Sequence, residues 1–316
     1  MTQDPVLKLP QRPADSHKGT FGTVAVVGGC AIAASRMIGA PVLSARAALR
    51  AGAGIARLAM PAPILDEGIG LLPSATGVSI PVDLDGRIEP HDASAIIDQM
   101  VGSCQCLVVG PGLGHPSHSG PGTAAAALRA VQQEEIPVVI DADALNALAQ
   151  VPHLSADFHA AAVLTPHPGE FRTLAASLSI RADPVDPRAR PAAAEALAQR
   201  LGCIVVLKGS ASIVTDGHRT WTCGRGHPCL ATAGTGDVLA GTIASLVAQN
   251  FRLSNPRPAI DLFSLACIAV DAHAAAGELW AKTNHAAAGL LAPELADLLP
   301  QSLEPYRAAS TPNAAG

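Results

Sequence analysis

Aromatic side chains and charges are scarce in this sequence. Of its 316 residues, 3% are aromatic and 15% are charged, and the formal net charge is −5. No lysine- or arginine-rich stretch occurs, which argues against nucleic acid as a main partner. With a hydrophobic content of 49%, the chain can bury a large core, and that core must be built from alanine, valine, leucine and isoleucine.

Long apolar runs and paired cysteines are also missing. No uninterrupted apolar run reaches the ~18 residues of a membrane-spanning helix, because Asp237, Gln249 and Asp271 break the longest candidates. Residues 1–16 lack the apolar core of a secretory signal peptide. The seven cysteines are odd in number and form no CxxC pair, which argues against a disulfide framework or a zinc site. We therefore expect a cytoplasmic protein with reduced, buried thiols.

Short apolar runs alternate with helical patterns along the chain. Buried strands are predicted over residues 24–27, 55–60, 105–109, 137–140, 162–164 and 203–207. Helices are predicted over about 39–53, 121–133, 238–247, 258–278 and 289–299, with another ending near 201, whereas residues 61–98 look less regular. A hairpin is expected around Asp216-Gly217. This order predicts an α/β fold with a single doubly wound, mostly parallel sheet flanked by helices.

The ends of the chain differ from its body in composition. Residues 1–16 are polar and contain proline, and we expect a flexible arm there. Residues 301–316 are rich in alanine, serine and proline, which predicts a disordered tail. Because no linker interrupts the alternation of strands and helices, one domain is predicted over residues 17–300.

The segment Gly234-Thr235-Gly236-Asp237 precedes the apolar helix predicted over 238–247. Glycines and a threonine at a helix start leave backbone N–H groups unpaired, and these donors together with the helix dipole attract an anion. A carboxylate held beside a bound phosphate, as Asp237 would be, indicates a general base. The alternative is that Thr235 or Asp237 only caps the helix.

Five further loops of the kind that binds ligands follow strands, over residues 28–40, 110–114, 141–146, 165–170 and 208–212. The carboxyl ends of parallel strands share one edge of a sheet, where α/β proteins bind their ligands. Asp141, Asp143 and Asn146 could hold Mg²⁺ through waters, bind polar substrate groups, or cap a helix. His167 lies between two prolines that fix its loop, a position better suited to contact than that of most histidines.

Taken together, six loops occur in the order of one family. The chain resembles, over about residues 16–300, the ADP- or ATP-dependent NAD(P)H-hydrate dehydratases of the ribokinase-like superfamily. The resemblance rests on HKGTFG at 17–22, VGPGLG at 109–114, IDADALN at 140–146, LTPHPGE at 164–170, LKG at 207–209 and AGTGDVLAG at 233–241. The last motif alone would indicate only the superfamily, whereas TPHPGE combined with DADALN and GPGLG is much more specific.

The resemblance implies a metabolite repair reaction. Hydrated NADH or NADPH carries a hydroxyl on its nicotinamide ring; the family phosphorylates that hydroxyl, and loss of phosphate restores the double bond. By the same resemblance, Gly234, Thr235 and Gly236 would form the anion hole around the transferred phosphoryl group. Asp237 would take the proton of the hydroxyl.

The resemblance also implies which residues hold the two substrates. The adenine nucleotide, ADP or ATP, would contact Lys208, Gly209, Ser210, Ala211, Ser212 and Gly236. The hydrated dinucleotide would contact Ala40, Gly112, His167 and Asp237. Mg²⁺ is expected as a cofactor, with Asp141, Asp143 and Asn146 as the candidates to order the metal or the phosphates.

Two motifs depart from the family pattern. The chain has Met37-Ile38-Gly39-Ala40 where the family commonly has Met-Pro-Gly-Ala, and Gly226-His227-Pro228-Cys229 where it commonly has Gly-Asn-Pro-Gly. The second change puts in doubt a contact of the asparagine side chain, although His227 could still donate a hydrogen bond. Many relatives carry an N-terminal epimerase domain. Only about 16 residues precede the first motif here, so we expect no epimerase activity from this chain.

Other functions stay open from the sequence. A ribokinase-like kinase acting on a vitamin precursor would share the anion hole and Asp237 but release a phosphorylated product. A nucleotide-binding relative without activity is a second alternative, and an oxidoreductase is disfavoured because the first glycine loop lacks the dinucleotide fingerprint. The sequence does not choose between ADP and ATP or between the two hydrates. The alanine-rich helices offer flat apolar faces on which a homo-oligomer could form.

Overall fold

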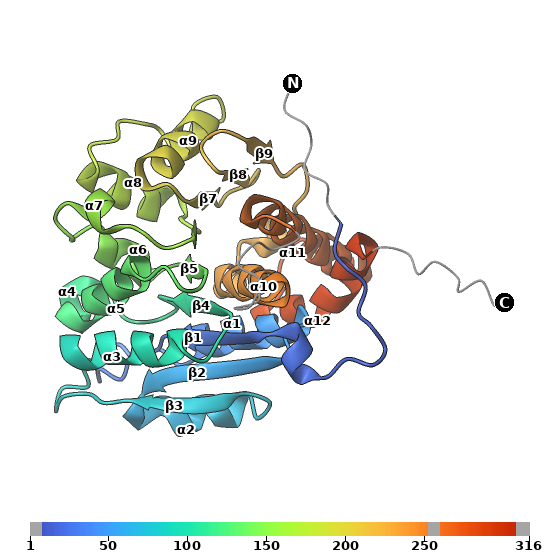
Figure 1. Ribbon diagram of the computed structural model, residues 1–316. Coiled ribbons are helices and arrows are strands. Elements are labelled where there is room, and N and C mark those ends of the chain that lie inside the picture. Colours follow the sequence, from blue (N-terminus) through green and yellow to red (C-terminus); the bar gives the residue numbers. More distant parts are fainter. Residues whose placement is uncertain (1–7, 252–259, 308–316) are drawn as a thin grey trace.

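The computed structural model describes residues 8–251 and 260–307. Within them, nine strands form one sheet in the order β3-β2-β1-β4-β5-β6-β7-β8-β9 (Figure 1). The strands are β1 (Thr23–Val27), β2 (Ile55–Pro61), β3 (Thr76–Ile80), β4 (Cys106–Val109), β5 (Val138–Ile140), β6 (Ala162–Leu164), β7 (Ile204–Leu207), β8 (Ile213–Thr215) and β9 (Thr220–Thr222). The strands from β3 to β7 are parallel, and β8 and β9 add an antiparallel hairpin. The predicted doubly wound, mostly parallel sheet is confirmed.

The central strands are buried along their whole length because helices cover both faces of the sheet. All five residues of β1 and all four of β4 and β7 are buried, so their sequences are continuous apolar runs rather than alternating ones. Val26 of β1 pairs with Leu58 of β2 on one side and with Val108 of β4 on the other. The chain first winds from β1 toward β3 and then from β4 toward β9. The point of reversal, between β1 and β4, is where such sheets open a crevice for ligands.

Two helical layers cover the sheet. One hydrophobic cluster joins it to α1, α2, α10, α11 and α12, and a second cluster on the opposite face joins it to α3, α5, α6, α8 and α9. Figure 1 shows α10–α12 on one side of the sheet and α3, α5 and α8 on the other. The helices are α1 (Gly39–Arg50), α2 (Ala62–Leu71), α3 (Pro90–Val101), α4 (Pro116–Ser119), α5 (Pro121–Gln132), α6 (Asp143–Leu148), α7 (Leu154–Asp157), α8 (Pro168–Ser177), α9 (Arg190–Leu201), α10 (Thr235–Asn250), α11 (Leu262–Asn284) and α12 (Ala292–Leu303), with short 3₁₀ turns η1 (Lys18–Phe21), η2 (Pro228–Leu230) and η3 (Glu304–Tyr306).

The region that looked irregular, residues 61–98, contains regular structure. It forms α2, the edge strand β3 and the start of α3. Two features concealed it. The glycines at 68, 70 and 77 weaken both helical and strand patterns, and β3 exposes most of its residues because it lies at the edge of the sheet. Gly68 is required by packing, since a Cβ there would lie 2.7 Å from Met60 Sδ.

The predicted limits of the domain were too narrow. α12 runs to Leu303 and η3 follows it, with Tyr306 buried, so residues 301–307 belong to the folded body and not to a tail. At the other end, Leu9 is buried and its N–H donates to Tyr306 O at 2.6 Å. The segment 8–16 therefore packs against the body rather than forming a loose arm. The rest of the predicted arm (1–7) and tail (308–316), like the predicted helix start at 258–259, lies outside the described residues.

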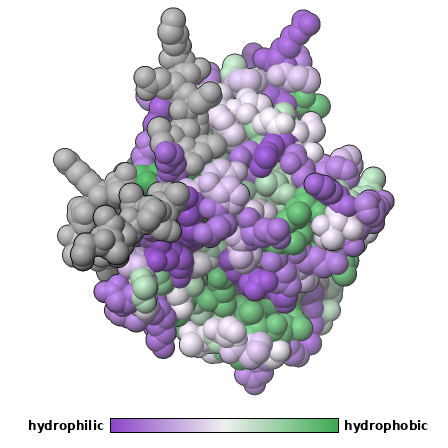
Figure 2. All heavy atoms as spheres, turned by 90° about the vertical axis from the view of Figure 1, so that its right-hand side faces the viewer, coloured by the Kyte–Doolittle hydropathy of each residue, from purple (hydrophilic) through white to green (hydrophobic). Residues whose placement is uncertain are grey.

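One helix has the length and composition of a membrane span. α11 contains 23 residues, and 61% of its most apolar window is buried inside the molecule. Its apolar side chains pack against α10 and α12 as part of the core. Figure 2 shows that the face on the side of α11 and α12 carries separate apolar patches among polar residues. The apolarity of α11 is that of a core helix.

Candidate functional site

The glycine turn at the start of α10 has a conformation that leaves its amides free. Gly234 has φ of +90°, and a Cβ there would lie 2.7 Å from Leu43 Cδ1, so only glycine fits. The Thr235 hydroxyl lies 2.9 Å from both Leu230 O and Thr232 O, which fixes the turn. Within the described residues, the N–H groups of Gly236 and Asp237 have no acceptor. They and the positive end of a 16-residue helix form a place for an anion. We call residues 234–237 the anion turn.

Asp237 lies in the first turn of α10 with a carboxyl group that resists ionisation. Burial, reinforced by the charge of Asp141, raises the pKa of Asp237 to about 7, although Lys208 opposes the rise. Its backbone is held from the other side of the crevice, because the Ser44 hydroxyl donates to Asp237 O at 2.9 Å. A carboxyl group whose pKa lies near neutrality can exchange protons during a reaction.

Lys208, which directly follows β7, joins two buried carboxylates. Its Nζ lies 2.8 Å from Asp141 Oδ1 and 3.8 Å from Glu170 Oε2. Burial by itself would lower the pKa of Lys208, but the charges of Asp141 and Glu170 outweigh it and raise the pKa. Thr165 Oγ1 also donates to Asp141 Oδ1, at 2.7 Å. The ammonium group is therefore permanently charged. It also lies beside the anion turn, since a Cβ on Gly236 would be 3.5 Å from Nζ.

The loop between β6 and α8 is built as a reciprocal cap. His167 Nδ1 accepts from the N–H groups of Gly169 at 2.9 Å and of Glu170 at 3.2 Å, while Glu170 Oε2 accepts from His167 N at 2.8 Å. This is a capping box in which histidine replaces the usual serine or threonine. The cap uses Nδ1 and leaves the imidazole half exposed to solvent, with Nε2 3.4 Å from Glu170 Oε1.

The loops after β1 and β4 pack against each other where the sheet reverses. Gly29 N donates to Pro111 O at 3.0 Å. Gly112 has φ of +64°, and a Cβ there would lie 3.2 Å from Ala40 Cβ and 3.1 Å from Met37 Cβ. Ala40 and Gly112 are thus neighbours on the wall of the crevice. Their small size lets the two loops approach each other closely.

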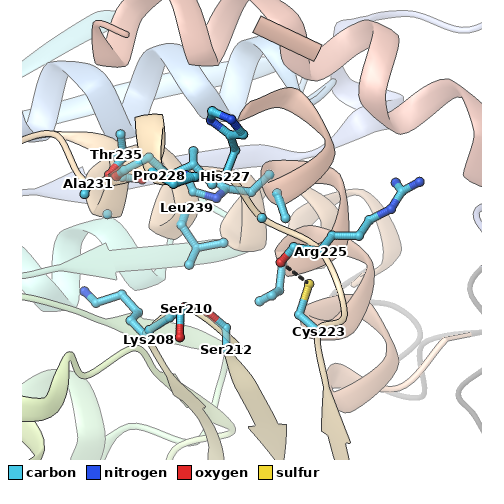
Figure 3. A pocket seen from close by; sticks show the side chains of 17 residues that line it. Lys208, Ser210, Ser212, Cys223, Arg225, His227, Pro228, Ala231, Thr235 and Leu239 are labelled. Atoms are coloured by element: carbon cyan, nitrogen blue, oxygen red, sulfur yellow. Dashed lines mark hydrogen bonds between the residues drawn. The ribbon is translucent and has the colours of Figure 1, made fainter. Parts of the chain in front are cut away.

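A cavity of about 460 Å³ opens beside the anion turn. Figure 3 shows Lys208, Ser210 and Ser212 on one wall and His227, Pro228, Ala231 and Thr235 facing them, with Leu239 between. The remaining wall comes from Val270, His273 and Ala274 of α11 and from the 223–226 segment. A volume of this size holds a small molecule, and one end of it meets the free amides of the anion turn.

Comparisons with known proteins identify the family of this chain. A model of the NAD(P)H-hydrate dehydratase family matches residues 24–301. The chain belongs to the NAD(P)H-hydrate dehydratase family. The resemblance inferred from six loops is thereby confirmed.

Three known proteins illustrate how far the likeness extends. The "bifunctional NAD(P)H-hydrate repair enzyme Nnr" of Salinibacter ruber is 37% identical over 294 residues, which are 92% of this chain and 50% of that protein. The chain thus spans about half the length of the curated relatives it matches. An "ADP/ATP-dependent NAD(P)H-hydrate dehydratase" of Bacillus subtilis, co-crystallised with ATP/Mg²⁺, has a TM-score of 0.73 at 28% identity, with 95% of each chain covered. A hydroxyethylthiazole kinase of Pyrococcus horikoshii, at 16% identity and a TM-score of 0.57, shares the fold.

The structure of this dehydratase-family chain brings most of the predicted residues to one edge of the sheet. The predicted nucleotide residues Lys208, Gly209, Ser210, Ser212 and Gly236 all line the cavity, whereas Ala211 does not. The predicted dinucleotide residues lie outside the cavity lining, on the loops that follow β1, β4 and β6 and, for Asp237, in the first turn of α10. The two predicted groups therefore lie on different loops at this edge of the sheet, and Gly236 and Asp237, one from each group, are neighbours in the first turn of α10.

Asp141, Asp143 and Asn146, the residues predicted to hold a metal, differ in how many hydrogen bonds their side chains already make. Asp141 is occupied by Lys208 and Thr165. Asp143 Oδ2 accepts only from Gly114 N, at 2.9 Å, and burial raises its pKa. Asn146 is partly exposed on α6 and has no hydrogen-bonded partner among the described residues. Within those residues no three His, Cys, Asp or Glu side chains form a metal site.

A buried arginine explains why position 209 is a glycine. The Arg190 guanidinium, at the start of α9, donates to Leu207 O at 3.2 Å and to Lys208 O at 3.1 Å. A Cβ on Gly209 would lie 2.4 Å from Arg190 Nη2. Arg190 is 7% exposed, and no carboxylate pairs with it among the described residues. It fixes the end of β7 and therefore the point from which Lys208 extends.

The altered motif at His227 keeps the function of a cap. His227 Nδ1 accepts from Cys229 N at 3.3 Å and starts the 3₁₀ turn η2. An asparagine side chain can accept the same bond, since both residues cap helical turns. The sequence had suggested that His227 would act as a donor; in this contact it is the acceptor.

Three polar residues of the site were not assigned a role from the sequence. Thr165 and Glu170 were read only as members of a loop, yet both belong to the network around Asp141 and Lys208. His273 lines the cavity and bonds to Thr235 O at 2.9 Å. Only His273 had a signal in the sequence, since a polar residue in a helix otherwise apolar enough to be buried needs a partner.

Proposed function

We propose that this chain dehydrates hydrated NADH or NADPH at the expense of ADP or ATP. The ring hydroxyl attacks the terminal phosphoryl group, the bond from that phosphorus to the nucleotide breaks, and Asp237 accepts the hydroxyl proton. The ring carbon–oxygen bond then breaks, phosphate leaves, and a proton is lost from the neighbouring ring carbon, which restores the double bond. The observation that carries the proposal is Asp237 itself, a carboxyl group with a pKa of about 7 on the anion turn.

The residues around Asp237 suit phosphoryl transfer. Charge that builds up on the transferred group needs fixed donors. The N–H groups of Gly236 and Asp237 and the ammonium of Lys208 would supply them. Because Lys208 is held by two carboxylates, it would not have to reorganise when the phosphate arrives.

The two substrates would enter from different sides of Asp237. The nucleotide would occupy the cavity, with its phosphates at the anion turn and contacts from Lys208, Gly209 and Ser210. The hydrated dinucleotide would lie across the crevice on Ala40, Gly112 and His167. Ala211 and Ser212 were part of the predicted nucleotide loop; Ser212 lines the cavity, whereas Ala211 does not.

Mg²⁺ is proposed as the cofactor. When bound, the ion neutralises phosphate charge and orients the leaving group. The free carboxylate oxygen of Asp143 and the amide of Asn146 would hold it through waters, and Asp141 would contribute through its effect on Lys208. All three side chains belong to the loop and helix that follow β5.

The test is recovery of the near-ultraviolet absorbance of reduced nicotinamide. Chemically hydrated NADH and NADPH are incubated separately with ADP or ATP and Mg²⁺. We expect recovery that depends on the nucleotide, and the four combinations decide the preferred substrates. A stable phosphorylated product without recovery would instead identify a kinase, as a vitamin-precursor kinase would behave. Thermal stabilisation by nucleotide without any turnover would identify a catalytically silent relative.

We further propose that the protein acts in the cytoplasm and has no nucleic-acid or membrane partner. All seven cysteines are free and buried, as suits a reducing compartment. A homo-oligomer is proposed through its apolar surface patches, and light scattering of the purified protein tests it.

A further inference from the structure

His273 is a polar residue in the middle of the apolar helix α11. Its Nε2 lies 2.9 Å from Thr235 O, the carbonyl of the first residue of α10. A carbonyl oxygen can only accept, so Nε2 must carry the proton. Burial, together with the nearby charge of Lys208, lowers the pKa of His273 to about 4. The imidazole is therefore neutral and remains a fixed donor.

A second residue of α11 holds the same segment one helical turn away. Gly277 packs against Leu230, where a Cβ would lie 2.7 Å from Leu230 Cγ. Cys229 Sγ donates to Gly277 O at 3.3 Å. Residues four apart lie on one face of a helix. One face of α11 thus touches the segment 229–235 at both of its ends, and this segment leads directly into the anion turn.

The hydrogen bond from His273 differs from the other bonds at Thr235 because it comes from another helix. The side chain of Thr235 is already held by Leu230 O and Thr232 O, both within the segment. His273 connects the first residue of α10 to α11, whereas Ser44 of α1 holds the carbonyl of Asp237 two residues further on. We propose that His273 is a positioning residue that fixes the anion turn against α11 and so sets the position of the amides of Gly236 and Asp237. This inference rests on the proposed function.

The test replaces His273 with glutamine or asparagine, two amides whose side chains differ in length. The amide nitrogen of glutamine can occupy the place of Nε2, whereas that of asparagine is one carbon too short. In His273→Asn and His273→Leu we expect kcat to fall between about 10- and 100-fold, because small displacements of catalytic groups have effects of this size. His273→Gln should recover most of the loss. If asparagine and glutamine behave alike, or if the KM of the nucleotide changes while kcat does not, the positioning role is wrong.

A binding measurement separates positioning from direct contact. His273 Nδ1 has no partner among the described residues and His273 lines the cavity, so it could instead bind the nucleoside. Calorimetry with ATP and with adenosine distinguishes the two. Positioning predicts that His273→Leu weakens ATP severalfold more than adenosine, because only ATP reaches the anion turn. Equal weakening of both ligands would overturn the inference, and wild-type protein that binds neither would overturn the proposed function on which it rests.

Discussion

The two sides of the anion turn are built from different kinds of residue. On one side, which we call the charged side, lie Asp141, Asp143, Glu170 and the ammonium of Lys208, joined by ion pairs and by hydrogen bonds to Thr165 and Gly114. On the other, the cavity side, about half of the wall is glycine, alanine, leucine and valine. Lys208 belongs to both sides, Arg225 is the other charged residue of this wall, and its histidine at 273 is neutral.

The difference indicates a division of labour. Burial raises the pKa of Asp237, Asp143 and Glu170, and the charge of Asp141 adds to each rise. The apolar part of the cavity wall has no such effect but selects a ligand by shape. Changes on the charged side should therefore alter the rate and its pH dependence, whereas changes to apolar residues of the cavity wall that do not hold the anion turn should alter nucleotide affinity.

Removing the charge of Asp237 should have the largest effect. We expect Asp237→Asn to lower kcat by about a thousandfold, since a general base contributes roughly 10²–10⁴. Nucleotide affinity measured by calorimetry should stay within about threefold, because the amides of the turn remain. Substantial residual turnover would exclude Asp237 as the base.

Lys208→Met should reduce both activity and stability. Its loss leaves Asp141 and Glu170 buried without their cation, and breaking a buried pair in this way costs about 3–5 kcal/mol. We expect the free energy of unfolding, measured with urea at pH 8, to fall by about 3 kcal/mol, and kcat to fall by about a hundredfold. Lys208→Arg is the matched control that keeps the charge. If the two variants are equally stable, the ion pairs do not hold this side together.

The pH dependence should follow Asp237. The base must be ionised, so kcat/KM should fall about tenfold per pH unit below its pKa of about 7 and level off above it. Stability should change in the opposite sense. The folded protein binds this proton more tightly than the unfolded chain, whose carboxyl titrates near 3.8. Its contribution to the free energy of unfolding is therefore lost as the pH rises from about 4 to about 7. Asp237→Asn should lack that change, and parallel profiles for the two proteins would contradict the assignment.

Filling the cavity should affect only the nucleotide. Ala274 lies on the α11 wall, and Ala274→Leu adds volume there without adding charge. We expect the KM of ADP or ATP to rise about tenfold while kcat at saturation stays within about twofold. Ala276, which is buried on the same helix but absent from the cavity wall, is the control site for a leucine substitution. A change in the KM of the hydrated dinucleotide would show that the two sides are not separate.

The smallest effect is expected at His227. His227→Asn should keep activity within about threefold, because asparagine can accept the bond from Cys229 N. His227→Ala removes the cap and should lower the midpoint of thermal unfolding by a few degrees, equivalent to about 1 kcal/mol. Equal losses in both variants would mean that the imidazole has a further contact that asparagine cannot make.

The sequence was most informative where strands end. The apolar run before Asp141 and the glycine turn before Asp237 each specify local structure, and a parallel sheet brings such ends together. Local patterns cannot show which side chains then meet. The ion pairs from Lys208 to Asp141 and Glu170 join residues 67 and 38 positions apart, and the hydrogen bond from His273 to Thr235 joins two helices. The edge strand β3 was missed because an exposed strand lacks the apolar run that marks a central one.

The buried guanidinium of Arg190, under the loop at Lys208, should constrain which residues evolution accepts at positions 190 and 209. Arg190 occupies the volume that a side chain at position 209 would need, and its bonds to Leu207 O and Lys208 O replace those that a different loop would make for itself. A side chain at position 209 would clash with Arg190. Loss of Arg190 would remove the hydrogen bonds that it donates to Leu207 O and Lys208 O. Among homologous chains, positions 190 and 209 should therefore vary together, with glycine at 209 wherever the arginine is kept. The two lie nineteen positions apart along the sequence.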